Sequence, residues 1–221
     1  MSMRLVVGIM AIAAILLAYL LGGGAGTSIS YQNGVGTYEV SSSGLSLLAS
    51  LLILATYSIA LEPAKSASTI APAASGTRRA AAWFIDFFLA LTALTSVLAL
   101  IPLTLEAVRT GTFVWQFRRS DTSTSDVLVT LLVVGLSFIG MGFYWAIPVL
   151  RGAQTVGQCI LAIRVVPAMP TPFSPARVWL RGVVQPFAPF LWLAKLVSGK
   201  YWHDEFANTR VVKVLPNHAA A

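Results

Sequence analysis

Long runs of apolar residues account for most of this chain, and four of them are long enough to cross a lipid bilayer. A helix rises about 1.5 Å per residue and the hydrocarbon core is about 30 Å thick, so a span takes roughly 17 to 25 residues. The four runs are residues 5–21, 45–61, 80–105 and 127–150. This pattern predicts an all-α integral membrane protein with four transmembrane helices.

A fifth apolar stretch, residues 178–197, is broken by Arg181, Pro186, Pro189 and Lys195. Proline removes a backbone donor and kinks a helix, and non-helical backbone persists at membrane depth only where protein or water covers it. We expect this Pro-broken segment to form either a bent, partly inserted or interfacial hairpin, or a fifth full span. The basic residues at both of its ends favour the hairpin.

Alternation of polar and apolar residues over residues 28–40 predicts a small β element outside the bilayer. The alternation surrounds Asn33-Gly34, a pair typical of a two-residue hairpin turn. With that turn, Ile29 would lie opposite Tyr38, so that apolar side chains share one face. A flexible loop rich in serine and glycine is the alternative.

Two further runs, residues 160–166 and 209–214, alternate in the same way and end at prolines. We expect them to pair as strands on one side of the membrane. For residues 155–163 an amphipathic interfacial helix is the alternative.

The segment before the third apolar run is rich in alanine, serine and proline and has no periodicity, which is typical of a linker. The chain is therefore expected to divide into four parts. These are an amino-terminal transmembrane helix pair with an external hairpin (1–62), a linker (63–77), a membrane domain (78–215) and a tail (216–221).

Composition supports the membrane assignment, because 57% of the residues are hydrophobic and 10% are charged, against about 25% charged in soluble domains. The net charge is +7, but the basic residues lie at the edges of apolar segments. That placement indicates anionic lipid and excludes nucleic acid as the expected partner. One cysteine, Cys159, and two histidines are too few for a disulfide or a metal centre, so no metal and no cofactor is expected.

Lysine and arginine in the connecting loops predict the orientation. The loop of residues 22–43 has none, whereas residues 63–79 contain Lys65, Arg78 and Arg79. We expect a multi-pass protein of the plasma membrane with its amino terminus in the cytoplasm and the hairpin outside. Three arginines, Arg109, Arg118 and Arg119, lie between the third and fourth spans. In this orientation they would be outside the cell, so they oppose the assignment. The first apolar run also admits a signal peptide, although it is longer than a typical one.

Asp86 is the one acid inside the predicted spans, about two helical turns into the third. A carboxylate at the centre of a bilayer costs roughly 2.5 to 3.5 kcal/mol on insertion scales, so such residues face the protein interior or a water-filled cavity. We expect Asp86 to pair with a cation. Arg181, itself stranded in the Pro-broken segment, is the first candidate, and Arg79 is the second.

Three blocks occur in an order that resembles the RDD family of bacterial and archaeal membrane proteins. They are residues 78–86, which begin Arg-Arg and end in Asp, residues 154–166, which run from Gln-Thr-Val-Gly-Gln into Arg-Val-Val, and Arg181 followed by residues 203–212. The chain departs from the family pattern at Ala153, Gln158 and Asn208, where glycine, lysine and glycine are expected. The loss of the lysine removes a basic group that would meet an anionic ligand.

The charges in the apolar segments and the three blocks together give a set of candidate ligand or ion-pair residues. The main candidates are Arg79, Asp86, Arg181 and Asp204. The secondary candidates are Gln154, Thr155, Gly157, His203 and Thr209.

Two functions fit these features. In the first, the protein transports a small solute, a cation or a proton, with Asp86 as the binding group; the RDD resemblance implies suggested roles of this kind. In the second, it is an accessory or structural subunit of a larger membrane complex, with other membrane proteins or further copies of itself as partners. No enzymatic activity and no catalytic residue is expected, since the sequence has no G-x-S-x-G, HExxH or P-loop motif.

Overall fold

The computed structural model describes residues 3–21, 25–32, 35–61, 72–169, 173–192 and 201–214. They form two compact units. Unit 1 comprises Met1–Ile9, Thr56–Phe88 and Met141–Ala221, and unit 2 comprises Met10–Ala55 and Leu89–Gly140. The division predicted from the sequence stays a prediction, and most of its linker lies outside the described residues.

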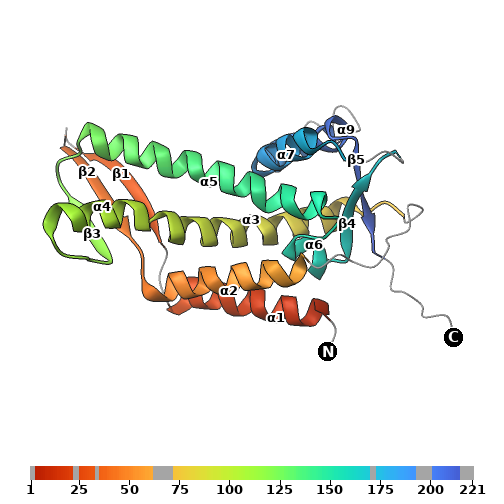
Figure 1. Ribbon diagram of the computed structural model, residues 1–221, viewed down its shortest axis with the longest axis horizontal. Coiled ribbons are helices and arrows are strands. Elements are labelled where there is room, and N and C mark those ends of the chain that lie inside the picture. The colour runs from red at the N-terminus through yellow and green to blue at the C-terminus, as the bar shows by residue number, and fades with distance from the viewer. Residues whose placement is uncertain are drawn as a thin grey trace. The chain divides into compact units, whose positions relative to one another are not determined.

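The described helices follow the predicted apolar runs (Figure 1). Helix α1 covers Met3–Leu16 and continues through the π-helical turn η1, Leu17–Leu21. The later helices are α2 (Gly44–Ala60), α3 (Gly76–Leu98), α4 (Leu100–Thr110) and α5 (Thr124–Leu150).

Three of the described helical stretches are long and apolar enough to cross a membrane: Met3–Leu20, Gly76–Thr110 and Thr124–Leu150. The protein is therefore a membrane protein built on apolar helices. Helix α2 has 17 residues, which is shorter than each of these three. The fourth span predicted from the sequence consequently stays a prediction.

The sheet of unit 2 contains strands β1 (Gly26–Gln32), β2 (Val35–Ser41) and β3 (Gln116–Arg119), all antiparallel, with β2 in the middle (Figure 1). Ile29 lies opposite Tyr38, which is the register that the alternation predicts. The turn residues Asn33 and Gly34 lie outside the described residues. Tyr38 and Val40 pack with Leu103 in a small core, so one face of the hairpin is buried.

In unit 1, β4 (Ile163–Pro167) pairs antiparallel with β5 (Thr209–Lys213), so the two predicted runs do pair. The prediction was wrong for residues 160–162, the first three of the first run, which are not part of the strand. Ile160 ends the short helix α6, Val156–Ile160, and Ala162 has a left-handed backbone with φ of 54°. The helical alternative therefore holds for residues 156–160.

The Pro-broken segment forms helix α7 (Pro175–Val184), the 3₁₀ turn η2 (Gln185–Phe187) and a helical continuation over residues 188–192. The helix type changes where Pro186 removes a backbone donor, as expected. The remainder of the segment lies outside the described residues. Helix α9, Trp202–Phe206, packs beside α7 (Figure 1). The apolar core of unit 1 draws on α3, α5, α7 and both strands through Ala82, Ala146, Val149, Val165, Val178 and Val211.

Candidate functional site

Asp86 is 1% exposed and its carboxylate is held by neutral donors of unit 1. Tyr144 donates its hydroxyl to Oδ1 at 2.8 Å, and the backbone N–H of Gly157 donates to the same oxygen at 2.8 Å. The Thr155 hydroxyl donates to Oδ2 at 2.6 Å. Among the described residues Asp86 makes no ion pair. Interior placement was predicted, but the predicted pairing with Arg181 or Arg79 is wrong.

The turn that supplies two of these donors is fixed by a capping box. Thr155 is the N-cap of α6, its hydroxyl accepts from the Gln158 N–H at 3.3 Å, and the Gln158 side chain accepts from the Thr155 N–H at 3.3 Å. Gln158 stands where the family pattern has lysine, and here it stabilises the turn. Gly157 has no room for a side chain, because a Cβ there would overlap the Ala82 carbonyl oxygen.

The two arginines expected to meet Asp86 both bind Asp204 instead. Arg181 donates from Nη2 at 2.9 Å and from Nε at 3.2 Å to Oδ1. Arg79 pairs with the other oxygen, Oδ2, and its guanidinium lies 3.6 Å from the centre of the Tyr201 ring. The carboxylate of Asp204 therefore compensates both guanidinium groups. Burial acts to raise the pKa of Asp204, but the charges of Arg181 and Arg79 outweigh burial and hold the pKa below its ordinary value.

His203 lies beside Asp204 in a buried position, 5% exposed. Burial is the main cause that lowers its pKa to about 4, so the ring is neutral near pH 7. Its Nε2 lies 3.6 Å from Asp204 Oδ1, which favours the tautomer with the proton on Nε2. Nδ1 is then an acceptor, and it is buried without a hydrogen-bond partner among the described residues.

A cavity of about 30 Å³ in unit 1, which we call the inner cavity, joins these groups. This volume suits one or two water molecules. Its lining includes Asp86, Gln158, Gln185, His203, Arg79 and Arg181. The side-chain oxygen of Gln185 is a second buried acceptor without a partner in the described part of the chain.

The remaining secondary candidates support the backbone around the site. Gln154 donates its amide to the carbonyl oxygens of Ile163 at 2.5 Å and Gln158 at 3.3 Å, linking α6 to β4. Thr209 donates its hydroxyl to the Asp204 carbonyl oxygen at 3.3 Å, where α9 leads into β5. These two residues position the site and do not line the inner cavity.

Sequence reasoning missed Tyr144 and Gln185. Tyr144 lies in an apolar run, where a tyrosine is expected to be a ring packed in lipid or core, and only its hydroxyl shows the polar role. The Tyr57 ring stacks on it at 4.7 Å, and the Tyr57 hydroxyl donates to the Tyr144 carbonyl oxygen at 2.9 Å. Gln185 is adjacent to Pro186 in the Pro-broken segment and was not singled out there.

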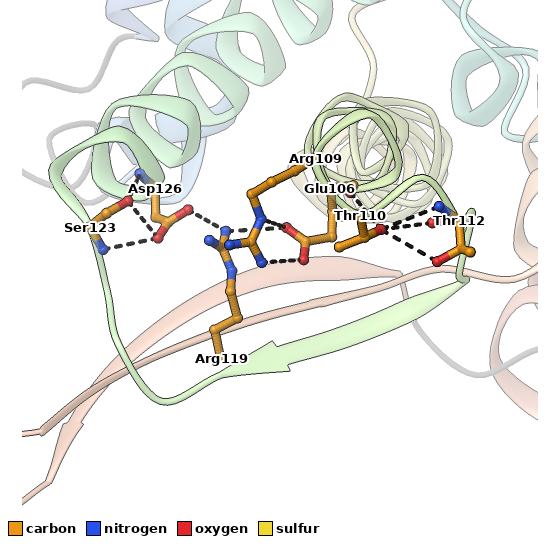
Figure 2. Close-up of polar contacts among 7 residues, drawn as sticks. All are labelled: Glu106, Arg109, Thr110, Thr112, Arg119, Ser123 and Asp126. Atoms are coloured by element: carbon orange, nitrogen blue, oxygen red, sulfur yellow. Dashed lines mark hydrogen bonds and ion pairs between the residues drawn. The ribbon is translucent and has the colours of Figure 1, made fainter.

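A second cluster of charged residues, also missed, lies in unit 2 (Figure 2). Glu106 is buried and accepts from Arg109 at 2.6 and 3.1 Å, and Arg119 reaches both Asp126 at 2.5 Å and Glu106 at 3.7 Å. Asp126 also accepts from the backbone N–H of Ser123 at 2.9 Å, in a capping box that begins α5. Two acids and two arginines balance in charge, and the contacts tie α4, β3 and α5 together.

A family model described as the RDD family matches residues 73–208 of this chain. The match includes all nine candidate residues except Thr209. No curated protein matches the chain. No solved structure matches it either.

Proposed function

Since the chain belongs to the RDD family of membrane proteins, we propose that it transports a proton or a small cation, with Asp86 as the group that binds and releases it. One observation carries the proposal. Asp86 is a buried acid that accepts hydrogen bonds from neutral donors, and it lines a cavity large enough for one or two water molecules.

The cost of placing an acid in a membrane helix supports a functional role for Asp86. Elsewhere in the described chain the buried acids Glu106, Asp126 and Asp204 are each compensated by at least one arginine. Asp86 differs from them because its negative charge is left for a mobile cation or proton to neutralise. The arginines that line the same cavity are already bound to Asp204.

Two residues that line the inner cavity have buried acceptors, and these acceptors support an exchangeable occupant. In the described part of the chain, His203 Nδ1 and the Gln185 side-chain oxygen are buried without a donor, and leaving such acceptors unsatisfied is costly. A water molecule can donate to each of them and approach Asp86 within the same space. Such a molecule gives a proton a route to and from the carboxylate.

Replacement of Asp86 by asparagine tests the transport role. Asparagine keeps the shape of the side chain and one acceptor oxygen but cannot carry a charge, so we expect proton-driven or cation-dependent flux in proteoliposomes to fall at least about tenfold. Flux is measured with a dye enclosed in the vesicles, and thermal stability is measured on the same preparations. Asp121→Asn, a change at an exposed loop acid, is the control and should leave flux unchanged. Wild-type flux in a folded Asp86→Asn protein contradicts the proposal.

A second candidate function, an accessory or structural subunit, is favoured by the three donors that already satisfy Asp86. In this case the carboxylate holds the N-terminus of α6 against α3, and partner proteins or further copies supply the activity. Purification in mild detergent distinguishes the two candidates. A stable complex with other chains, together with no flux in either the wild-type protein or the Asp86→Asn variant, supports the accessory function. In neither case do we assign catalysis to these side chains.

We also propose an orientation: the protein lies in the plasma membrane with its amino terminus in the cytoplasm, α2 as a fourth span and the β1–β2 hairpin outside. The loop containing the hairpin has no lysine or arginine, which supports an external position. Single cysteines at Ser42 and Ser68, in a chain lacking Cys159, should respond oppositely to an impermeant thiol reagent added outside intact cells. Equal labelling of the two positions contradicts this orientation.

A further inference from the structure

Unit 1 contains a second, larger hollow next to the inner cavity. This outer vestibule has a volume of about 400 Å³ and is lined by Ala73, Arg79, Tyr201, Asp204, Glu205 and Arg210, among others. Ala73, Glu205 and Arg210 are exposed, so the vestibule opens to the surface. The inner cavity, which contains Asp86, is much smaller.

Two residues, Arg79 and Val211, line both hollows. Val211 is fixed in β5 by its pairing with Val165. Arg79 has a long side chain near the beginning of α3, and both of its partners, Asp204 and Tyr201, line the outer vestibule. Arg79 therefore lies where the two hollows meet.

The ion pairs of Asp204 are arranged so that one arginine can leave. Arg181 holds Oδ1 through two hydrogen bonds and its side chain is 4% exposed. Arg79 binds Oδ2, and its side chain is 12% exposed. If Arg79 moves to solvent, Asp204 keeps the Arg181 pair, so no buried charge is left uncompensated. A long arginine side chain near a helix end can reach water without moving its backbone.

From this arrangement we propose that Arg79 is a gate between the two hollows: bound to Asp204 and Tyr201 it separates the inner cavity from the outer vestibule, and released from them it connects Asp86 with the vestibule. The inference rests on the proposed function for its purpose, because a gate regulates a site only if Asp86 exchanges an ion. The connection between the inner cavity and the outer vestibule, in contrast, can be measured without any measurement of transport.

Reaction of a thiol introduced into the inner cavity tests the gate. Ala82→Cys, in a chain with Cys159→Ser, places a single thiol in the inner cavity, where Ala82 is 3% exposed. The reagent is methyl methanethiosulfonate, which is uncharged, so its rate of reaction reports access to the thiol and not the local potential. We expect Arg79→Gln to raise this rate at least about tenfold, which corresponds to a larger open fraction.

Matched variants separate gating from unfolding. Arg78→Gln removes the neighbouring charge, which lines neither hollow, and should leave the rate unchanged. Ala73→Cys, in the vestibule, should react quickly in every variant. Tyr201→Ala leaves the charge of Arg79 in place but removes the ring beneath it, and should raise the reaction rate of the thiol at position 82 by a smaller factor. It also serves as the test if Arg79→Gln does not fold.

The outcomes distinguish this inference from the transport proposal. Equal reaction rates for the thiol at position 82 with and without Arg79, in folded protein, overturn the gate whatever the flux. A faster reaction in Arg79→Gln together with wild-type flux in Asp86→Asn supports the passage and overturns the transport role. Slow reaction of the Ala82→Cys thiol in both Arg79→Gln and Tyr201→Ala also overturns the gate.

Discussion

Replacement of Gly157 by alanine is expected to be among the most damaging single changes in this protein. The added Cβ would overlap the Ala82 carbonyl oxygen and lie 3.0 Å from Asp86 Cγ. The first of these atoms belongs to the backbone of α3, so it cannot move aside without shifting the helix. Overpacking of this kind costs roughly 1 to 3 kcal/mol or more, and we expect a fall in the melting temperature of at least about 5 °C.

The measurement is thermal unfolding of the purified protein in mild detergent. Gly135→Ala is the matched control, because Gly135 is also in a helix and an added Cβ there meets nothing within 4 Å. An alanine at that position should be neutral or stabilising, since alanine has the higher helix propensity. Similar melting temperatures for Gly157→Ala and Gly135→Ala would show that α6 does not pack against α3 as described.

The sequence was sufficient to predict local structure where a short-range pattern determines it. The Ile29–Tyr38 register follows from alternation around a two-residue turn, and the pairing of β4 with β5 follows from two alternating runs. Strand β3 was not predicted, because a strand of 4 residues, Gln116–Arg119, is too short to show a periodicity.

The burial of Asp86 was predictable from the cost of an acid in a membrane helix, but its partners were not. The prediction assumed that only a cation can compensate a buried carboxylate. In the structure, three neutral donors do so, two of them from the turn at Thr155–Gly157, which lies 69 to 71 residues away in sequence. To predict whether a guanidinium or a capped turn binds the Asp86 carboxylate, one must know which elements of the fold are in contact. No local sequence pattern contains that information.

The same argument explains the position of the arginines. Arg79 and Asp204 are 125 residues apart in sequence, and they meet because the fold brings the beginning of α3 to α9. The sequence identified Asp86 and Arg181 because each lies in an apolar segment, where a charge is costly, and the RDD-like blocks added Arg79 and Asp204. The pairing within the set depended on tertiary structure.

The pairing of Arg181 with Asp204 leads to the second prediction of large effect. Asp204→Asn should lower the free energy of unfolding by roughly 3 to 5 kcal/mol, because it leaves the buried Arg181 without its counter-charge. Arg181→Gln should cost less, because Asp204 keeps its pair with Arg79. The double variant should cost less than the sum of the two, since the second change removes the charge that the first one left unpaired. Arg177→Gln, one turn earlier on α7 and exposed, is the control and should cost less than about 0.5 kcal/mol.

A parallel cycle between Arg181 and Asp86 discriminates the observed pairing from the one expected from sequence. Stability of all variants is followed by thermal or denaturant unfolding in the same detergent. Because Arg181 binds Asp204 and makes no hydrogen bond to Asp86 in the described part of the chain, the coupling energy should be larger in the Arg181–Asp204 cycle. A larger coupling between Arg181 and Asp86 would contradict the structure, since it would place the guanidinium on the carboxylate of α3 instead of on that of α9.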